Sequence, residues 1–369
     1  LSCEKSKSGW AVVLDRTAFY PEGGGQPADH GTLGAVQVTD VHETKGVIFH
    51  TCDGPVEIGT QVAGAVDWPR RFDHMQQHSG EHILSGLLCS LYHCDNVGFH
   101  LGADTVTIDY NAELTWEQVM AAEKAANEVI WQDTPVDITF PAPDALARLN
   151  YRSKKALTGQ VRIVAFPGAD CCACCGTHVL RSGQVGLVKF LSVQKFREGV
   201  RIELLCGKRA LEYLSRTWEQ AKAIGQRLSV KPVDSEAAVE RLEGELASLK
   251  LRCAQLEESV FESMAKEQAG KGNVLLFQPA MRPDSVRRLM DAVSKTCCGL
   301  AAVFAGEEGH YAYALGRADG QDISPLVKAM NTALHGRGGG RNGFAQGSVE
   351  TERSAIESFF KENGYGICD

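Results

Sequence analysis

The sequence has no long unbroken apolar run, no basic leader followed by an apolar stretch, and no excess of positive charge. The first absence argues against a membrane span, and the second leaves secretion unsupported. The net charge of −8 argues against a protein that coats nucleic acid indiscriminately, although it allows a local basic groove. With 369 residues, of which 44% are hydrophobic, the chain is expected to form a soluble globular protein of two or three domains.

The chain contains 13 cysteines, an odd number at irregular spacing. Together with the missing leader, this pattern favours a reducing cytosol over a disulfide framework, so we expect a cytoplasmic protein. The densest stretch is Cys171-Cys172-Ala173-Cys174-Cys175. Cysteines this dense in an intracellular chain usually indicate metal or redox chemistry.

Two segments each offer a pair of metal ligands four residues apart. His78 and His82 have the spacing that places two side chains on one face of a helix, and the apolar run that follows supports a half-buried helix. Cys174 and His178 lie in a glycine-containing segment, which is expected to be a loop or a strand end. If the two segments converge, they form one tetrahedral zinc site.

Spacing alone leaves the ligand set open. His74 lies four residues before His78, and three further cysteines compete with Cys174, namely Cys171, Cys172 and Cys175. The alternative for the histidine pair is an ordinary surface or core role. Glu81 invites comparison with the general base of His-Glu-x-x-His zinc hydrolases. We do not assign that role, because a residue three positions after His78 need not face the ion.

The first 66 residues alternate short β-type runs with glycine-containing turns and predict a small β-barrel or meander. The runs cover residues 10–14, 36–39 and 46–49. Three consecutive glycines, Gly23, Gly24 and Gly25, allow the backbone to approach a ligand closely or to adopt positive φ. The alternative for these glycines is a mobile hairpin tip.

Residues 67–206 predict an α+β domain. Thr115 and Gln118 have the form of a capping box that opens a helix, and Pro135 ends this helix. Strand-like runs occupy residues 105–109, 161–164, 186–190 and 201–205. We expect one antiparallel sheet to bring the two candidate metal segments together.

Apolar residues at helical spacing predict a long antiparallel helical hairpin over residues 207–268, with a break at Pro232. The seam consists of Leu211, Leu214, Trp218, Ala221, Leu228, Leu242, Leu246, Leu249, Cys253, Leu256 and Val260. We expect it to serve internal packing or self-association, so the hairpin could form a homodimer.

The final hundred residues alternate predicted strands (272–277 and 300–304) with predicted helices (285–295 and 325–334), which indicates an α/β domain. The segment that follows, residues 335–347, interleaves glycines with two arginines. Such a segment can present amide hydrogens and guanidinium groups to phosphate, and a flexible surface loop is the alternative. It is not a Walker loop, because no Gly-Lys-Ser/Thr ends it.

Four motifs, in this order along the chain, resemble the long-form alanyl-tRNA editing proteins (AlaX). They are Phe19–Gln26, His78-x-x-x-His82, Cys174-x-x-x-His178-Val179 and the Gly-Arg-Gly-Gly-Gly-Arg segment that leads to Ala345-Gln346-Gly347. Related modules occur in the editing and C-terminal domains of alanyl-tRNA synthetase. The resemblance spans nearly the whole chain.

The resemblance implies an α+β multidomain fold. A small N-terminal β-barrel with the glycine-rich loop would occupy residues 1–66, and a zinc-containing editing domain residues 67–206. An antiparallel helical hairpin would link this domain, over residues 207–268, to a C-terminal α/β domain that binds tRNA, residues 269–369.

The resemblance also implies the site residues. The ligands of one Zn²⁺ per chain would be His78, His82, Cys174 and His178. The substrate pocket would be bordered by Gly23, Gly24, Gly25 and Gln26, with His100 and Ser79 as the catalytic candidates. The tRNA would be held by Arg337, Gly338, Gly339, Gly340 and Arg341. Relatives often have threonine at the position of Ser79 and glycine at that of Cys175, which leaves the amino-acid preference of the pocket open.

The implied activity is hydrolysis of the ester that joins a wrong amino acid, chiefly serine, to alanine tRNA. A synthetic pocket for alanine rejects serine poorly, so a second hydrolytic site supplies the missing discrimination. Zinc would either polarise a water or anchor the aminoacyl group.

One rival function is that of a phosphoesterase, which needs a carboxylate-rich Asp-His-His centre that the sequence does not show. The other is a non-catalytic, zinc-stabilised RNA-binding protein, which four protein ligands would suit.

Overall fold

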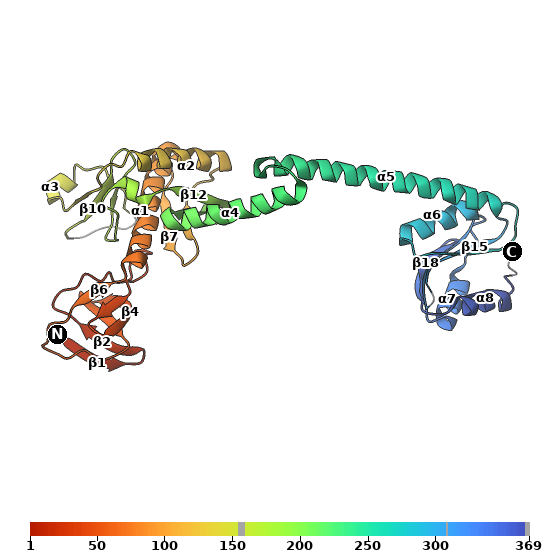
Figure 1. Ribbon diagram of the computed structural model, residues 1–369, viewed down its shortest axis with the longest axis horizontal. Coiled ribbons are helices and arrows are strands. Elements are labelled where there is room, and N and C mark those ends of the chain that lie inside the picture. The colour runs from red at the N-terminus through yellow and green to blue at the C-terminus, as the bar shows by residue number, and fades with distance from the viewer. Residues whose placement is uncertain (154–158, 308, 366–369) are drawn as a thin grey trace. The chain divides into compact units, whose positions relative to one another are not determined.

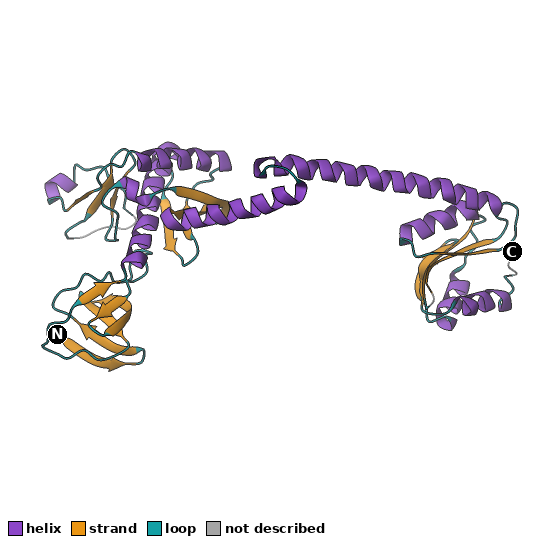
Figure 2. Ribbon diagram, viewed as in Figure 1, coloured by secondary structure: helices purple, strands orange, loops and turns teal. Residues whose placement is uncertain are grey.

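The computed structural model describes residues 1–153, 159–307 and 309–365. It divides into two compact units, Leu1–Arg227 and Leu228–Asp369 (Figure 1). Both units combine helices with sheets (Figure 2), in agreement with the predicted multidomain α+β fold. In the described part of the chain, we find no helix whose length and apolar character would let it cross a membrane.

The first unit begins with an antiparallel sheet of six strands. They are β1 (Ser2–Ser6), β2 (Gly9–Val13), β3 (Gly31–Leu33), β4 (Val36–Thr44), β5 (Val47–Cys52) and β6 (Gly64–Val66), in the order β1-β2-β5-β4-β3-β6. Because β1 and β6 form the two edges and do not pair with each other among the described residues, the sheet is open and not the predicted barrel. Phe19, Val41 and Cys52 are buried in its core.

Helix α1 (Trp68–Tyr92) follows this sheet directly. Asp67 begins it by accepting a hydrogen bond from the backbone N–H of Arg70, and Pro69 in the first turn needs no intrahelical partner. The helix ends at His93, whose φ of 53° is left-handed. Every residue from 74 to 86 in its middle is buried, so both predicted histidine ligands lie in the interior.

Two sheets, not one, surround α1. The larger has the order β12-β13-β8-β7 and consists of β12 (Val188–Phe196), β13 (Gly199–Cys206), β8 (Val106–Tyr110) and β7 (Asn96–Leu101). The smaller has the order β11-β10-β9 and consists of β11 (Asp170–Ala173), β10 (Ile163–Phe166) and β9 (Asp137–Thr139). The strand that leads to Cys174 is β11, which pairs with β10 and so belongs to the smaller sheet; the predicted single sheet is wrong.

Helix α2 (Trp116–Trp131) contacts α1 and β12. Its predicted capping box is confirmed, because the Thr115 side chain accepts from the backbone of Gln118 and the Gln118 side chain accepts from the backbone of Thr115. The short elements of this region are α3 (Pro143–Leu146) and the 3₁₀ turn η1 (Ser182–Val185). A shared core of α1, α2 and the four-stranded sheet includes Ile83, Ile108 and Ile202.

Helix α4 (Gly207–Leu228) lies at the end of the first unit, and the second unit contains the 3₁₀ turn η2 (Pro232–Asp234) followed by the long helix α5 (Ser235–Glu267). Both helices lie where the sequence predicts them. Each carries exposed apolar side chains: Leu211, Leu214, Trp218 and Ile224 on α4, and Val239, Leu242, Leu246, Leu249, Leu251, Leu256 and Val260 on α5. Most of the predicted seam is therefore exposed.

The second unit contains a sheet of the order β14-β15-β16-β18-β17. Its strands are β14 (Val274–Gln278), β15 (Leu300–Glu307), β16 (His310–Arg317), β17 (Arg337–Arg341) and β18 (Phe344–Val349), and its helices are α6 (Pro283–Ser294), α7 (Ser324–Ala333) and α8 (Arg353–Glu362). Only β14 and β15 pair in parallel among the strands described. The Gly-Arg segment is the edge strand β17, paired with β18, and not the flexible loop that glycine content also allowed.

Candidate metal centre

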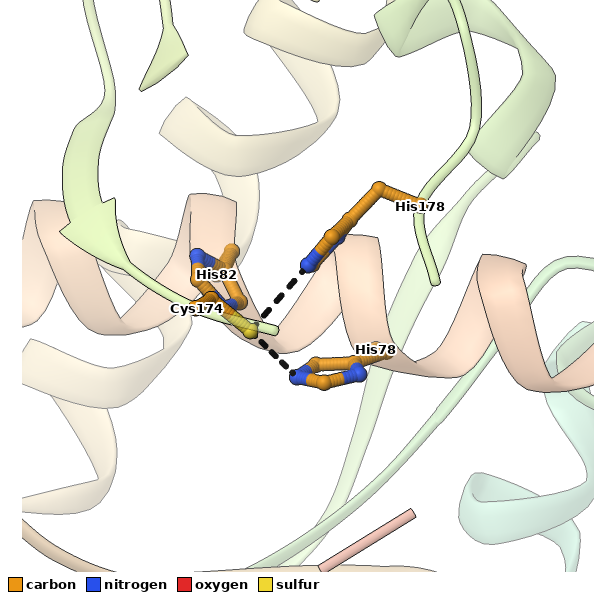
Figure 3. A group of neighbouring side chains, drawn as sticks. All are labelled: His78, His82, Cys174 and His178. Carbon is orange, nitrogen blue, oxygen red and sulfur yellow. Dashed lines mark hydrogen bonds between the residues drawn. The ribbon is translucent and has the colours of Figure 1, made fainter. Parts of the chain in front are cut away.

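Four side chains from two distant segments converge inside the first unit (Figure 3). His78 and His82 project from one face of α1, and Cys174 and His178 come from the segment after β11. Their candidate ligand atoms all lie within 4.8 Å of one another. The structure thus brings together the four residues that the sequence resemblance implies.

The donor set fits a zinc ion. The Cys174 sulfur lies 3.5 Å from Nε2 of His78 and 3.4 Å from Nε2 of His178. A tetrahedral zinc, with bonds of about 2.1 Å to nitrogen and 2.3 Å to sulfur, separates such atoms by about 3.6 Å. Imidazole and thiolate ligands also favour zinc over harder cations such as Mg²⁺ and Ca²⁺, which bind mainly oxygen atoms.

Each candidate histidine is held by a second contact through its Nδ1 atom. Nδ1 of His78 lies 2.8 Å from Oε1 of Gln26, and Nδ1 of His82 lies 2.9 Å from Oδ2 of Asp170. Nδ1 of His178 lies 3.1 Å from Oγ of Ser79. These contacts favour the tautomer that carries its proton on Nδ1, because Gln26 and Asp170 offer oxygen acceptors there. The Nε2 atoms are thereby directed toward the common centre.

Electrostatics prepare Cys174 as a ligand. Burial alone would raise its pKa, but hydrogen bonds from His178 and His78 lower the pKa of Cys174 far below that of an ordinary thiol. Burial would likewise lower the pKa of His82, but its hydrogen bonds to Asp170 and Cys174 raise this pKa above its usual value. A low thiol pKa yields the thiolate, which is the form of cysteine that binds metal.

The loop that carries Cys174 and His178 approaches α1 closely at Gly176. A Cβ atom on this residue would lie 2.2 Å from Cε1 of His78, so no larger residue fits without displacing the imidazole. Nη1 of Arg162 donates to the carbonyls of Cys174 and Gly176, at 2.7 and 2.9 Å, and fixes the loop from its other side. The backbone thus sets the position of the sulfur.

A cavity of about 510 Å³ opens beside the four ligands. His78, His82 and Cys174 form part of its wall, and the N-terminal loop forms another part. The remaining described lining residues are Tyr20, Pro21, Glu22, Gly23, Gly24, Glu43, Ile48, Glu81, Arg152, Ser153, Cys172, Ala173, Cys175 and Gly176. A metal-assisted reaction on a small chemical group of a substrate requires metal ligands and a cavity beside them.

The glycine-rich loop divides into two parts. Gly23 and Gly24 line the cavity, as predicted for a pocket-bordering loop. Gly25 instead packs on β7: its φ is 85°, its carbonyl accepts from the N–H of Leu101 at 3.0 Å, and a Cβ atom would lie 2.5 Å from the Phe99 carbonyl oxygen. The close approach of the Phe99 backbone therefore requires glycine at position 25. The loop is therefore docked and not a free hairpin tip.

Gln26 is fully buried behind the loop and acts on the ligands. Its Oε1 accepts from the N–H of Thr177 at 3.2 Å in addition to its contact with His78, and its Nε2 donates to Thr177 Oγ1 at 2.7 Å. Among the described residues, Gln26 is not one of those that line the cavity. We predicted a substrate contact for it, and the structure places it where it orients a ligand.

The two catalytic candidates lie outside the cavity wall as far as the chain is described. Ser79 is fully buried; its Oγ accepts from the N–H of Val179 at 3.1 Å and contacts His178. His100 is exposed on β7. Its neighbour Phe99 stacks on His78, with 5.0 Å between the ring centroids. Successive residues of a strand face opposite sides of the sheet. His100 thus points away from the ligands.

The other histidine and cysteines that spacing left as possible ligands do not join the four that converge. His74, Cys171 and Cys175 belong to none of the metal-compatible groups found among the described residues. Cys172 belongs to a second, overlapping group with His82 and Asp170. Asp170 is already bound by Arg152 through two hydrogen bonds of 2.7 and 2.9 Å, so this second group lacks a free carboxylate.

Sequence reasoning missed Asp170 and Arg152, and it set Glu81 aside. No spacing pattern links Asp170 to His82, which lies 88 positions earlier, so only the folded chain reveals this pair. Glu81 lines the cavity, with its Oε2 3.9 Å from Nε2 of His82. Its place immediately before a ligand histidine was the available sequence signal.

In the second unit, β17 exposes every residue of Arg337–Arg341. Gly338, Gly339 and Gly340 line a shallow cavity of about 320 Å³ together with residues of α7, including Lys328 and Asn331. Nδ2 of Asn331 donates to the Gly338 carbonyl at 3.1 Å and ties the helix to the strand. The edge offers backbone polar groups beside two arginines, as an anion-binding surface requires.

Comparisons with known proteins agree with this architecture. Residues 2–70 match the family described as tRNA synthetases class II (A), residues 161–203 the threonyl and alanyl tRNA synthetase second additional domain, and residues 270–362 the DHHA1 domain. The second match contains Cys174 and His178, and the third contains β17. Two of the three matched families are thus described by tRNA synthetases.

Three relatives specify the family. The alanyl-tRNA editing protein AlaX-L of Pyrococcus horikoshii is 31% identical over 95% of this chain and 91% of that protein. The alanyl-tRNA editing protein Aarsd1-B of Xenopus laevis is 35% identical over 66% of this chain and 60% of that protein. The alanine–tRNA ligase of Pyrococcus abyssi is 31% identical over 95% of this chain but only 41% of the ligase. The chain belongs to the family of long-form alanyl-tRNA editing proteins.

Proposed function

We propose that this protein is a trans-editing hydrolase that removes the wrong amino acid, chiefly serine, from mischarged alanine tRNA. The observation that carries the proposal is the cavity of about 510 Å³ that shares His78, His82 and Cys174 with the four-ligand cluster. Family membership supports the same activity, because two of the relatives are named alanyl-tRNA editing proteins.

One Zn²⁺ per chain is the metal that the donor set supports, with His78, His82, Cys174 and His178 as its ligands. When bound, zinc would supply a Lewis acid next to the cavity. Gln26, Asp170 and Ser79 orient the ligand imidazoles from behind. In this proposal Ser79 is a positioning residue, and His100 has no part in the chemistry, since it points away from the ligands.

The cavity is large enough to recognise one amino acid attached to a long nucleic acid. Gly23 and Gly24 let the backbone border the site without side chains, which leaves room for a ribose ester at the opening. Serine differs from alanine by a hydroxyl, and a site with a hydrogen-bonding group for that hydroxyl favours serine by orders of magnitude. Tyr20 and Ser153, which both carry a hydroxyl, are among the residues that line the cavity.

The second unit would hold the tRNA. Arg337 and Arg341 flank the three glycines of β17, and all five residues are exposed. Guanidinium groups and free backbone amides at a strand edge suit the phosphates of RNA.

We retain the proposed division of the chain into residues 1–66, 67–206, 207–268 and 269–369, with the last segment as the tRNA-binding domain. The exposed apolar residues of α4 and α5 are compatible with a homodimer.

A second candidate function follows from the ligand count. Four protein ligands complete a tetrahedral zinc shell, and closed shells are usually structural. A non-catalytic, zinc-stabilised RNA-binding protein would have the same cluster. The cavity beside the ligands favours the hydrolase, because a structural site needs no adjoining hollow.

A deacylation assay separates the two functions. Alanine tRNA charged with serine, glycine or alanine is incubated with the zinc-loaded full chain, and loss of the ester is followed over time. The hydrolase releases serine far faster than alanine, and serine tRNA charged with serine is the control for tRNA identity. Binding of alanine tRNA with no ester loss above the spontaneous rate would favour the second candidate.

A further inference from the structure

Helix α5 is one continuous helix of 33 residues (Figure 1), and it carries an apolar seam on its surface. The seam residues follow one another at alternating steps of three and four: Val239, Leu242, Leu246, Leu249, Cys253, Leu256 and Val260. All seven are exposed. Apolar residues at this period line one side of a helix and are typical of coiled coils, in which a second helix packs along the seam.

A different side of α5 packs inside the second unit. Phe261 and Ala265 are buried in a core that they share with residues of α6, including Leu289. At the same end of α5, Leu256 and Val260 of the seam remain exposed. The contact with α6 therefore leaves the seam uncovered.

The seam has the composition of a parallel, two-stranded coiled coil. In heptad notation its residues alternate between positions a and d, because three residues separate a from the next d and four separate d from the next a. The d positions are all leucine, namely Leu242, Leu249 and Leu256, and the a positions are Val239, Leu246, Cys253 and Val260. Leucine at d together with β-branched residues at a favours two parallel strands.

Charged residues flank the seam with complementary signs. In a parallel pair, position g of one helix lies beside position e of the next heptad in its partner. These positions combine Glu245 with Lys250 and Arg252 with Glu257, so both pairs join opposite charges. In an antiparallel pair whose seams overlap fully, Lys250 would meet Lys250 and Arg252 would meet Arg252. The charges therefore favour a parallel second copy of this chain.

Cys253 lies in the middle of the seam and is exposed. Identical a positions face each other in a parallel pair, so the Cys253 residues of the two copies would meet. Helix axes about 10 Å apart, less two helix radii of about 2.3 Å, leave about 5 Å between the facing Cα atoms. A disulfide can span this separation, so Cys253 reports on the pairing directly.

We propose that α5 forms a parallel, two-stranded coiled coil with α5 of a second copy of this chain. The seven seam residues form its core, and two copies of the Glu245–Lys250 pair flank it. Because α5 packs on α6 near its C-terminal end, a parallel pair brings both second units to the same end of the coiled coil. One dimer then presents two β17 edges. The pairing does not depend on the proposed hydrolase activity, so a negative deacylation assay would leave it standing.

The first test compares two leucines of α5 that are equally exposed, at 61% each. Leu256 occupies a d position in the seam, whereas Leu251 occupies the outer position f. Sedimentation equilibrium of the full chain measures the dissociation constant of the dimer. We expect Leu256→Glu to raise this constant by more than about 100-fold, because each copy loses a leucine from the core of the dimer. Leu251→Glu, the matched control, should leave it unchanged, and circular dichroism should show equal helix content in both variants.

The second test determines the orientation of the two helices. The Glu245 carboxylate is exposed and lies 3.9 Å from Arg241, whereas Glu257 is bound more closely, at 3.2 Å, by Arg288 of α6, so the Glu245–Lys250 pair is the one to reverse. We expect Glu245→Lys to raise the dissociation constant by about 2- to 30-fold. Adding Lys250→Glu to this variant should restore the wild-type value, because the pair is then reversed and again of opposite charge.

The third test uses Cys253. Oxidation of the wild-type dimer by diamide should join the two copies through a Cys253–Cys253 disulfide, which mass spectrometry of the linked peptides identifies. Cys298 is the control, because it is exposed but lies outside α5. It should form no link between copies.

Three results would overturn the inference. A chain that stays monomeric at every concentration measured would mean that something else covers the seam, such as α4 of the same chain. Equal weakening by Leu256→Glu and Leu251→Glu would place the dimer contact on another surface. Failure of Lys250→Glu to rescue Glu245→Lys, together with no Cys253–Cys253 link, would exclude the parallel arrangement.

Discussion

The Asp170 carboxylate joins His82 to Arg152. Its Oδ2 lies 2.9 Å from Nδ1 of His82, and both of its oxygens accept hydrogen bonds from the Arg152 guanidinium. Burial opposes the charge, but the hydrogen bonds of His82 and Arg152 lower the pKa of Asp170 below its ordinary value. A charged carboxylate behind a ligand histidine fixes the imidazole and increases its basicity.

Replacement of Asp170 should therefore weaken metal binding without removing a ligand. We expect Asp170→Asn to lower zinc affinity by about 10- to 100-fold. The dissociation constant is measured by competition with a chelator of known affinity. Asp144→Asn, at an exposed position on α3, is the control and should leave the constant unchanged. Equal affinities for the wild type and Asp170→Asn would show that this contact does not act on the metal.

The two neighbouring thiols should differ in their effect on zinc. Cys174 belongs to the converging group, whereas Cys175 is exposed and outside it among the described residues. Cys174→Ala should lose bound zinc and hydrolysis of seryl-tRNA, while Cys175→Ala retains zinc at one ion per chain. Metal content is measured by atomic emission and turnover by ester loss. Unchanged turnover of zinc-free Cys174→Ala would exclude a metal-dependent reaction.

The glycine-rich loop offers a matched pair of substitutions. Gly24 and Gly25 both have positive φ, at 60° and 85°, so alanine costs about 1 kcal/mol at either position. At Gly25 the added Cβ would also lie 2.5 Å from the Phe99 carbonyl oxygen, whereas at Gly24 nothing lies within 4 Å. We expect Gly25→Ala to lower the free energy of unfolding by at least about 1 kcal/mol more than Gly24→Ala. Urea denaturation measures this difference, and equal losses would mean that the loop is not docked on β7.

The arginines of β17 should act by binding phosphates. Replacing Arg337 and Arg341 by glutamine should weaken binding of alanine tRNA and reduce the slope of log K against log salt by about 1 for each arginine that binds a phosphate. Hydrolysis of a minimal aminoacyl-nucleoside, which lacks the tRNA body, should not change. Lys361→Gln, an exposed change on α8, is the control for net charge. An unchanged salt slope would place the tRNA elsewhere on the protein.

Local patterns in the sequence determined much of the secondary structure. The capping box at Thr115 and Gln118 begins α2, because these side chains satisfy backbone groups within a single helical turn. The spacing of His78 and His82 likewise places both imidazoles on one face of α1, since helical periodicity is a property of the local chain. The choice among the cysteines came from family resemblance and not from spacing.

Contacts between distant segments were decided only by the tertiary structure. Nothing in the sequence indicates that Gln26 reaches His78 or that Asp170 reaches His82, since hydrogen bonds between residues 52 and 88 positions apart depend on how the whole chain packs. The same holds for His100, which shares a strand with Phe99 but faces the opposite side because β7 pairs with β8 in one particular register. The sequence by itself determined which residues could bind a metal; the packing of α1 against two sheets decided how they are held and which carboxylate faces the cavity.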